Sequence, residues 1–217
     1  VQHAAKAVVT PVMACLLDRA AARAEFRRED VSPFFWVNGK VPTCDEWTAL
    51  VAGDFKDYRL KVYGLVENPV ELSLDDLRAL RMKTQVTLHH CIQGWSGIAE
   101  WGGLPVAELV RVVRPTPCAK AVVFYSFGEG AEGGQFYGSL AIENALHPQT
   151  LLAYEMNGAP LSHLHGAPLR LRVENQLGFK MVKWVQGIEF VEDVRSINRG
   201  EGGYNEDHEY FGELASI

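Results

Sequence analysis

Paired cysteines are missing from this chain. Its four cysteines (Cys15, Cys44, Cys91 and Cys118) stand far apart, with no CxxC pair among them. That spacing indicates neither a zinc ribbon nor a thioredoxin-like redox centre, and it argues against a dense disulfide framework. The sequence also lacks an HExxH zinc motif, a CxxCH haem site, an iron–sulfur cysteine set and a cytochrome b5-like domain.

Long apolar runs and an excess of positive charge are missing too. The longest apolar stretches, such as residues 7–17, fall short of the roughly 20 residues that a membrane-spanning helix needs. With 21 lysines and arginines against 27 aspartates and glutamates, the net charge is -6. This balance argues against a nucleic acid as the main partner. The chain begins at Val1 without a charged-then-apolar signal sequence, so we expect a mature or trimmed product.

The composition predicts one substantial core, because 47% of the 217 residues are hydrophobic. Residues 1–31, rich in helix formers, predict a helical leader, and residues 32–217 form the main domain. The patterns predict strands near 58–66, 84–88, 120–127, 150–156, 168–173 and 186–192, and helices near 73–80, 104–113 and 140–146. Because this spacing does not repeat as βαβ units, we expect an α+β fold with strand-rich mixed sheets and short helices.

Cys91 occupies the most informative stretch, VTLHHCIQGWSGIAEWGG at 86–103. There a short strand runs into a glycine-broken, tryptophan-rich loop, and a thiolate in such a place is a soft ligand for a redox-active metal. Gly94 and Gly97 let the backbone approach a bulky ligand closely. From the residues alone, burial as a small hydrophobe competes with this interpretation for Cys91, and burial is the expected role of the other three cysteines.

A second stretch, HGAPLRLRVENQLGFKMVKW at 165–184, carries a possible cradle for an anion. His165, Arg170, Lys180 and Lys183 lie along two strand-like runs that are joined by a polar turn. Guanidinium, ammonium and backbone N–H groups are the donors that a phosphate requires. Taken singly, each cation is compatible with an ordinary charge at a strand edge.

The two stretches together resemble the molybdopterin-binding oxidoreductases of the sulfite oxidase superfamily, most of all the branch containing the periplasmic methionine sulfoxide reductase catalytic subunit. Cys91, Trp95 and Trp101 match the pattern with which these enzymes supply a thiolate to molybdenum. HGAPLR followed by GFKMVK reproduces the pattern that holds the pterin phosphate. The resemblance implies a sulfite oxidase-type fold for residues 32–217, with Cys91 as both catalytic residue and metal ligand.

The resemblance also implies which residues contact the molybdenum–molybdopterin cofactor: Phe35, Trp36, Cys91, Ser126, His165, Arg170, Lys180, Met181, Val182 and Lys183. Ser126 stands where the family has a threonine, and His165 stands where the reductase branch usually has an asparagine. His90 replaces a frequent arginine. Phe35 and Trp36 match more loosely, so their backbone amides are the expected contacts. A strand and a tight turn at Asn157-Gly158 recur in the family as scaffold.

The implied activity is two-electron redox chemistry or oxygen-atom transfer at molybdenum, as S-oxide or N-oxide reduction or as sulfite-type oxidation. The small-molecule substrate would be served by an external electron carrier such as a cytochrome, since we expect no haem in this chain. The family suggests a periplasmic or cell-envelope location. The acidic, aromatic segment 198–212 would border the substrate entrance or be a surface tail.

Three other functions stay open on the residues. Cys91 with histidines 89, 90, 147, 163, 165 and 208 would suit a zinc-dependent hydrolase. Cys91 with a neighbouring histidine would suit a nucleophilic hydrolase, although sequence neighbours seldom adopt the required geometry. A binding module without a cofactor is the third alternative.

Overall fold

The computed structural model describes residues 24–130 and 133–197. Most of the leader predicted over residues 1–31 therefore lies outside the described residues, as do Cys15 and the segment 198–212. The described part of the leader holds one 3-10 turn, η1 (Arg28–Asp30).

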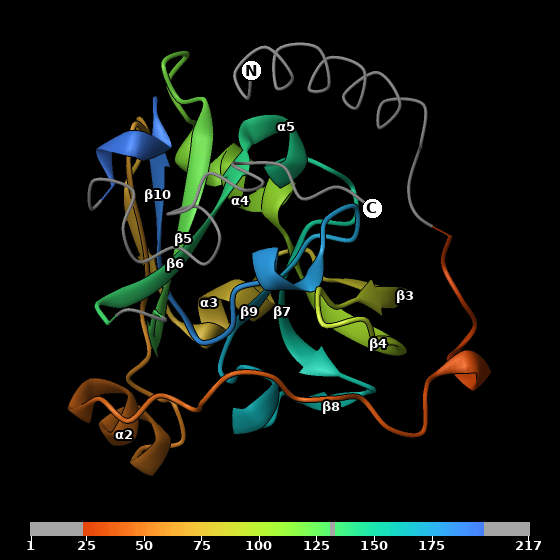
Figure 1. Ribbon diagram of the computed structural model, residues 1–217. Coiled ribbons are helices and arrows are strands. Elements are labelled where there is room, and N and C mark those ends of the chain that lie inside the picture. Colours follow the sequence, from red (N-terminus) through yellow and green to blue (C-terminus); the bar gives the residue numbers. More distant parts are fainter. Residues whose placement is uncertain (1–23, 131–132, 198–217) are drawn as a thin grey trace, which may run out of the picture.

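The first sheet has five strands in the order β2-β1-β10-β5-β6 (Figure 1). Its strands are β1 (Leu60–Gly64), β2 (Val70–Leu72), β5 (Ala121–Glu129), β6 (Gln135–Ala141) and β10 (Val185–Val191). β1 and β10 pair in parallel, with Lys61 opposite Gly187, whereas the other pairs in this sheet are antiparallel. β1 and β10, which are far apart in the sequence, thus lie side by side inside this sheet.

The second sheet is antiparallel and runs β3-β4-β7-β8, with β9 also paired to β7. Its strands are β3 (Lys83–His90), β4 (Ser96–Pro105), β7 (Leu151–Met156), β8 (Ala159–Pro160) and β9 (Arg170–Arg172). The turn between β7 and β8 has Asn157 at φ 53° and Gly158 at φ 77°. Asparagine and glycine tolerate this left-handed backbone best, which is why this pair closes a two-residue hairpin as predicted.

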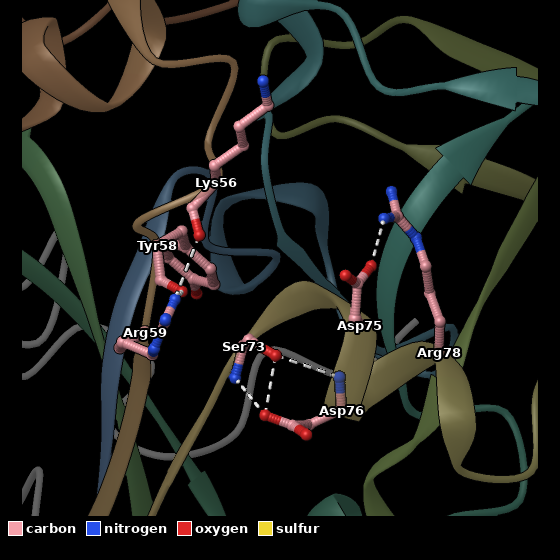
Figure 2. A network of polar contacts seen from close by, with 7 residues as sticks. All are labelled: Lys56, Tyr58, Arg59, Ser73, Asp75, Asp76 and Arg78. Atoms are coloured by element: carbon pink, nitrogen blue, oxygen red, sulfur yellow. Dashed lines mark hydrogen bonds and ion pairs between the residues drawn. The ribbon is translucent and has the colours of Figure 1, made fainter.

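The helices are short. They are α2 (Asp45–Ala52), α3 (Leu74–Ala79), α4 (Val106–Val113) and α5 (Ile142–Ala145), with 3-10 turns η2 (His163–His165), η3 (Gly178–Lys180) and η4 (Val194–Ser196). Of these helices, α3, α4 and α5 stand between the strands of the two sheets (Figure 1). The predicted start of α3 is confirmed. Ser73 Oγ accepts from the Asp76 backbone at 3.1 Å, and Asp76 Oδ2 accepts from the Ser73 backbone at 2.9 Å (Figure 2). Each bond satisfies a backbone donor that a helix start leaves open.

Apolar side chains from both sheets meet in one large core. The buried face of α4 shows why: Val106, Leu109 and Val113 recur at helical spacing, and all three are buried against the strands. A fully buried side chain of this size stabilises the fold by about 1.5–3 kcal/mol. The result is the strand-rich α+β architecture that the sequence predicts.

β4 (Ser96–Pro105) differs from the prediction for residues 86–103, which was a short strand followed by a loop broken by glycines. The glycines of β4 are the cause of the difference. Gly103 lies so close to β7 that an added Cβ would stand 2.1 Å from the Leu152 carbonyl oxygen. At Gly97 an added Cβ would stand 3.2 Å from the Phe35 ring. These glycines permit close approach of neighbouring chain and do not end the strand. The expectation of a loop over most of this stretch was therefore wrong.

Candidate active site

A cavity of about 660 Å³ opens where the two sheets and the segment before α2 meet. Its size suits a cofactor. The walls are supplied by 35–44, by the β3–β4 connection, by the end of β5 and by residues between 164 and 184. Nine of the ten predicted cofactor residues line it, namely Phe35, Trp36, Cys91, Ser126, His165, Arg170, Met181, Val182 and Lys183.

Lys180 is the predicted residue that does not line this cavity. Its side chain is buried, and its ammonium donates to the Ser139 carbonyl of β6 at 3.1 Å. The 3-10 turn η3 therefore directs Lys180 toward the first sheet, while the residues that follow it in the chain face the cavity.

Cys91 follows β3 directly and begins a tight loop. Its backbone N–H donates to the Trp95 carbonyl at 2.9 Å, and its carbonyl accepts from Gly94 at 3.0 Å. The sulfur accepts from the side-chain amide of Asn38 at 3.0 Å and from the backbone of Gln93 at 3.4 Å. Cys91 is 9% exposed. A sulfur that faces a cavity and receives N–H donors is arranged as a thiolate ligand would be.

Arg170, on β9, brings a buried positive charge to the cavity wall. Its guanidinium donates to the His165 carbonyl at 3.0 Å and lies 4.7 Å from the Trp101 ring centroid. Burial, and next the charge of Arg172, lower its pKa below the usual value. Its Nε has no hydrogen-bond partner among the described residues. The protein thus leaves part of this guanidinium unsatisfied, as a site for an anionic ligand requires.

Lys183 adds a second cation from the segment between η3 and β10. Its ammonium donates to the Leu164 carbonyl at 2.9 Å and to the Asn38 carbonyl, and it lies 4.1 Å from the Trp184 ring centroid. Burial, and next the charge of Arg170, lower the pKa of Lys183 to about 7. With Lys40, the lining holds three cations against one carboxylate, that of Glu129. The cavity is therefore electropositive.

The lowered pKa of Lys183 predicts a dependence of stability on pH. Between about pH 7 and pH 10.5 the unfolded chain binds a proton at this lysine that the folded protein has released. The free energy of unfolding of the cofactor-free protein should therefore rise with pH across this window, relative to a Lys183→Met variant, by on the order of 2 kcal/mol. Urea unfolding of both proteins at pH 7 and pH 9.5 measures this. A difference that stays constant between the two pH values contradicts the prediction.

Ser126 and His165 tie the walls together. Ser126 Oγ donates to the Lys183 carbonyl at 2.7 Å and accepts from the Gly128 backbone at 2.9 Å, which joins β5 to the lysine segment. His165 Nδ1 is hydrogen-bonded to Ser162 Oγ at 2.8 Å. Burial lowers the pKa of His165 below its ordinary value, so this ring is neutral near pH 7 and one ring nitrogen can donate.

His89 and Asn38 line the cavity although the sequence motifs did not single them out as cofactor contacts. His89 Nδ1 lies 3.0 Å from a guanidinium nitrogen of Arg172, which can only donate, so the proton of this ring resides on Nε2. Burial, and next the charge of Arg172, lower the pKa of His89 to about 2. The ring packs on Gly178, where an added Cβ would stand 2.4 Å from it. His90 turns elsewhere, to Ser96 Oγ at 2.9 Å, and does not line the cavity.

Two further cysteines differ from expectation. Cys44 and Cys118 are exposed and not buried, because Cys44 precedes α2 at its N-cap and Cys118 lies in the turn before β5. The prediction of burial was wrong for both.

The sequence model of one protein family, the oxidoreductase molybdopterin binding domain, matches residues 20–197 of this chain. The chain belongs to this family. The catalytic subunit MsrP of protein-methionine-sulfoxide reductase from Xanthomonas campestris pv. campestris is 36% identical over 201 residues, which cover 87% of this chain and 62% of that protein. A protein of Azospira oryzae, provisionally named as subunit YedZ1 of such a reductase, is 38% identical over 157 residues, covering 72% of this chain and 55% of its own length.

A solved structure of the same architecture is the sulfane dehydrogenase SoxCD from Paracoccus pantotrophus. It is 27% identical to this molybdopterin-binding domain, with a TM-score of 0.56 over 64% of this chain and 39% of that one. The chain spans a little over half the length of the two curated relatives above. Within residues 24–130 and 133–197, the helices are all too short or too polar to cross a bilayer.

The residues of this molybdopterin-binding domain fit the cofactor by their chemistry. A cysteine sulfur stands on one wall, and three cations with neutral histidines stand on the others, which suits a molybdenum ligand and a phosphate-bearing pterin. A zinc hydrolase finds less support. In the part of the chain that the structure describes, no three His, Cys, Asp or Glu side chains gather as a metal site.

Proposed function

We propose that this chain is the catalytic domain of a molybdenum oxidoreductase in which Cys91 ligates the metal. One observation carries the proposal: the Cys91 sulfur shares a cavity with the buried cation Arg170 and the half-buried cation Lys183. A thiolate alone suits many metals, and cations alone suit many anions. Their combination in a space of about 660 Å³ suits a metal held by an anionic organic cofactor.

The roles of the side chains follow from their contacts. Arg170 and Lys183 would neutralise the pterin phosphate, and His165 and the backbone of Met181 and Val182 would orient the pterin by hydrogen bonds. Ser126 would hold the lysine segment in place through the Lys183 carbonyl. The bound cofactor supplies the two-electron redox chemistry. The protein would fix its orientation through these side chains.

We propose reduction of an S-oxide or N-oxide as the reaction. The two relatives described above, at 36% and 38% identity, carry names that assign them to reduction of methionine sulfoxide in proteins. Sulfite-type oxidation is the second candidate, because the structural neighbour is named a sulfane dehydrogenase. An external electron carrier such as a cytochrome would close the cycle, and the family resemblance favours the periplasm or cell envelope as the location.

The first test is elemental analysis of the protein purified from a host that makes molybdopterin, together with fluorescence of the oxidised pterin released on denaturation. We expect about one molybdenum per chain, because one cavity brings the proposed ligand Cys91 together with the cations Arg170 and Lys183. Zinc without pterin would instead support the hydrolase. Absence of both metal and pterin would support a binding module and reject the enzyme.

The direction of the reaction needs a second assay on the loaded protein. Chemically reduced enzyme should be reoxidised by methionine sulfoxide, whereas sulfite should not transfer electrons to an artificial acceptor at a comparable rate. The opposite preference would replace the reductase with the sulfite-type oxidation.

A further inference from the structure

An amide from the segment before α2 ends on the sulfur of Cys91. Asn38 Nδ2 lies 3.0 Å from Sγ, the shorter of the two donor distances to this sulfur. We propose that Asn38 is a positioning residue that sets the reduction potential of the bound metal through this hydrogen bond. The inference rests on the function proposed above, since it needs Cys91 as a ligand.

The backbone that carries Asn38 is held in place by contacts on both sides of this residue in the sequence. Its own backbone carbonyl accepts from the Lys183 ammonium. Gly39, which follows it, has φ +78° and lies beside the Trp184 ring, so the chain turns sharply there in a conformation that favours glycine. Upstream, Phe35 is buried, with its ring centroid 5.6 Å from that of Trp101. Because these contacts fix the backbone, the amide loses little further freedom when it bonds to sulfur.

The orientation of the amide follows from charge. A thiolate can only accept, so the NH2 group of Asn38 must face the sulfur, and the carbonyl oxygen would be repelled. The N–H bond withdraws electron density from the sulfur. It therefore favours the reduced, more electron-rich state of an attached metal. Loss of this donor should lower the reduction potential.

Asn38 links two walls of the cavity. Asn38 meets the proposed metal ligand with its side chain and the proposed phosphate ligand Lys183 with its backbone. A cofactor that pulls Lys183 toward its phosphate would act on the loop that carries the thiolate donor. The two contacts together therefore couple the position of Lys183 to the hydrogen bond on the Cys91 sulfur.

The test compares the molybdenum reduction potentials of Asn38→Leu, Asn38→Asp and Asn38→Gln with that of the wild type. Each potential is obtained from a redox titration in which electron paramagnetic resonance monitors the metal. We expect Asn38→Leu to shift the one-electron equilibrium toward the oxidised metal by about tenfold, which is about 59 mV. Asn38→Asp should shift it further, because a carboxylate adds negative charge beside the thiolate. Asn38→Gln should recover part of the shift. Asn68→Leu is the matched control, since that amide donates to the Val112 carbonyl and does not line the cavity.

A second measurement uses the cofactor-free protein, so that loss of metal from a variant does not end the test. The side-chain amide resonance of Asn38 should move on Cys91→Ala substitution, and that of Asn68 should not. An unmoved Asn38 resonance, or a wild-type potential in a fully loaded Asn38→Leu protein, would overturn the inference. A wild-type protein without molybdenum would instead defeat the proposed function.

Discussion

Cys91→Ser should reduce turnover by more than about 100-fold while the protein keeps most of its pterin. The effect is this large because the ligand itself changes, and even changes to groups behind a metal ligand cost 10–100-fold. A serine hydroxyl is not ionised near neutral pH, so it would not replace the soft thiolate. We expect the pterin to stay bound because the cations proposed to hold it, Arg170 and Lys183, lie on other segments. Turnover, molybdenum content and pterin fluorescence are measured on one preparation.

Cys118→Ser is the matched control for this substitution. Cys118 is exposed and does not line the cavity, so its variant should keep full turnover and full molybdenum. Full activity in the Cys91→Ser protein would refute the assignment of the metal ligand. Loss of pterin together with metal would mean that the thiolate, and not the cations, provides most of the grip.

Glu174→Gln should destabilise the protein by about 3–5 kcal/mol, since it would leave a buried guanidinium without its counter-charge. The Arg172 and Glu174 side chains are both 0% exposed, and their two hydrogen bonds measure 2.6 and 3.0 Å. Gln85 also donates to this carboxylate, at 3.1 Å. Because the free energy of unfolding of a small domain is only about 5–15 kcal/mol, this loss would be a large part of it. Urea unfolding monitored by tryptophan fluorescence measures the change.

An exposed pair in the same molecule provides the control. Glu67 lies 3.1 Å from Arg114 with both side chains more than half exposed, so Glu67→Gln should cost no more than about 1 kcal/mol. Equal losses in Glu174→Gln and Glu67→Gln would mean that burial adds nothing to the Arg172 pair. The Glu174 variant should also disturb His89, which is hydrogen-bonded to Arg172 on the cavity side.

Those parts of the site that lie on contiguous motifs could be predicted from the sequence. Cys91, Arg170 and Lys183 stand in stretches whose order and spacing identify a family, and the cavity gathers all three. Asn38 could not be found in this way, because its contact with sulfur depends on how a loop from another part of the chain folds back. The direction of Lys180 depends on a single 3-10 turn, which its spacing from Lys183 does not reveal.

The fold divides along similar lines. Strands with alternating or β-branched residues, such as β5, and the capped helix α3 were predictable from local patterns. β4 was not, because Gly97 and Gly103 are explained by Phe35 and by the Leu152 carbonyl, which come close only after folding. Local sequence patterns predict only what neighbouring residues favour, whereas glycine is required at these positions by residues that are remote in sequence.

The parallel pairing of β1 with β10 also sets the order of events during synthesis. A ribosome releases β1 early, but its partner strand β10, and the segment that carries Lys183, emerge much later. A nascent chain that ends before Lys183 holds Cys91, Lys40 and Arg170 but lacks the third cation of the cavity wall. Folding must wait for this remote contact, which makes it slow. The cavity can therefore be complete only after residues 164–184 have been synthesised.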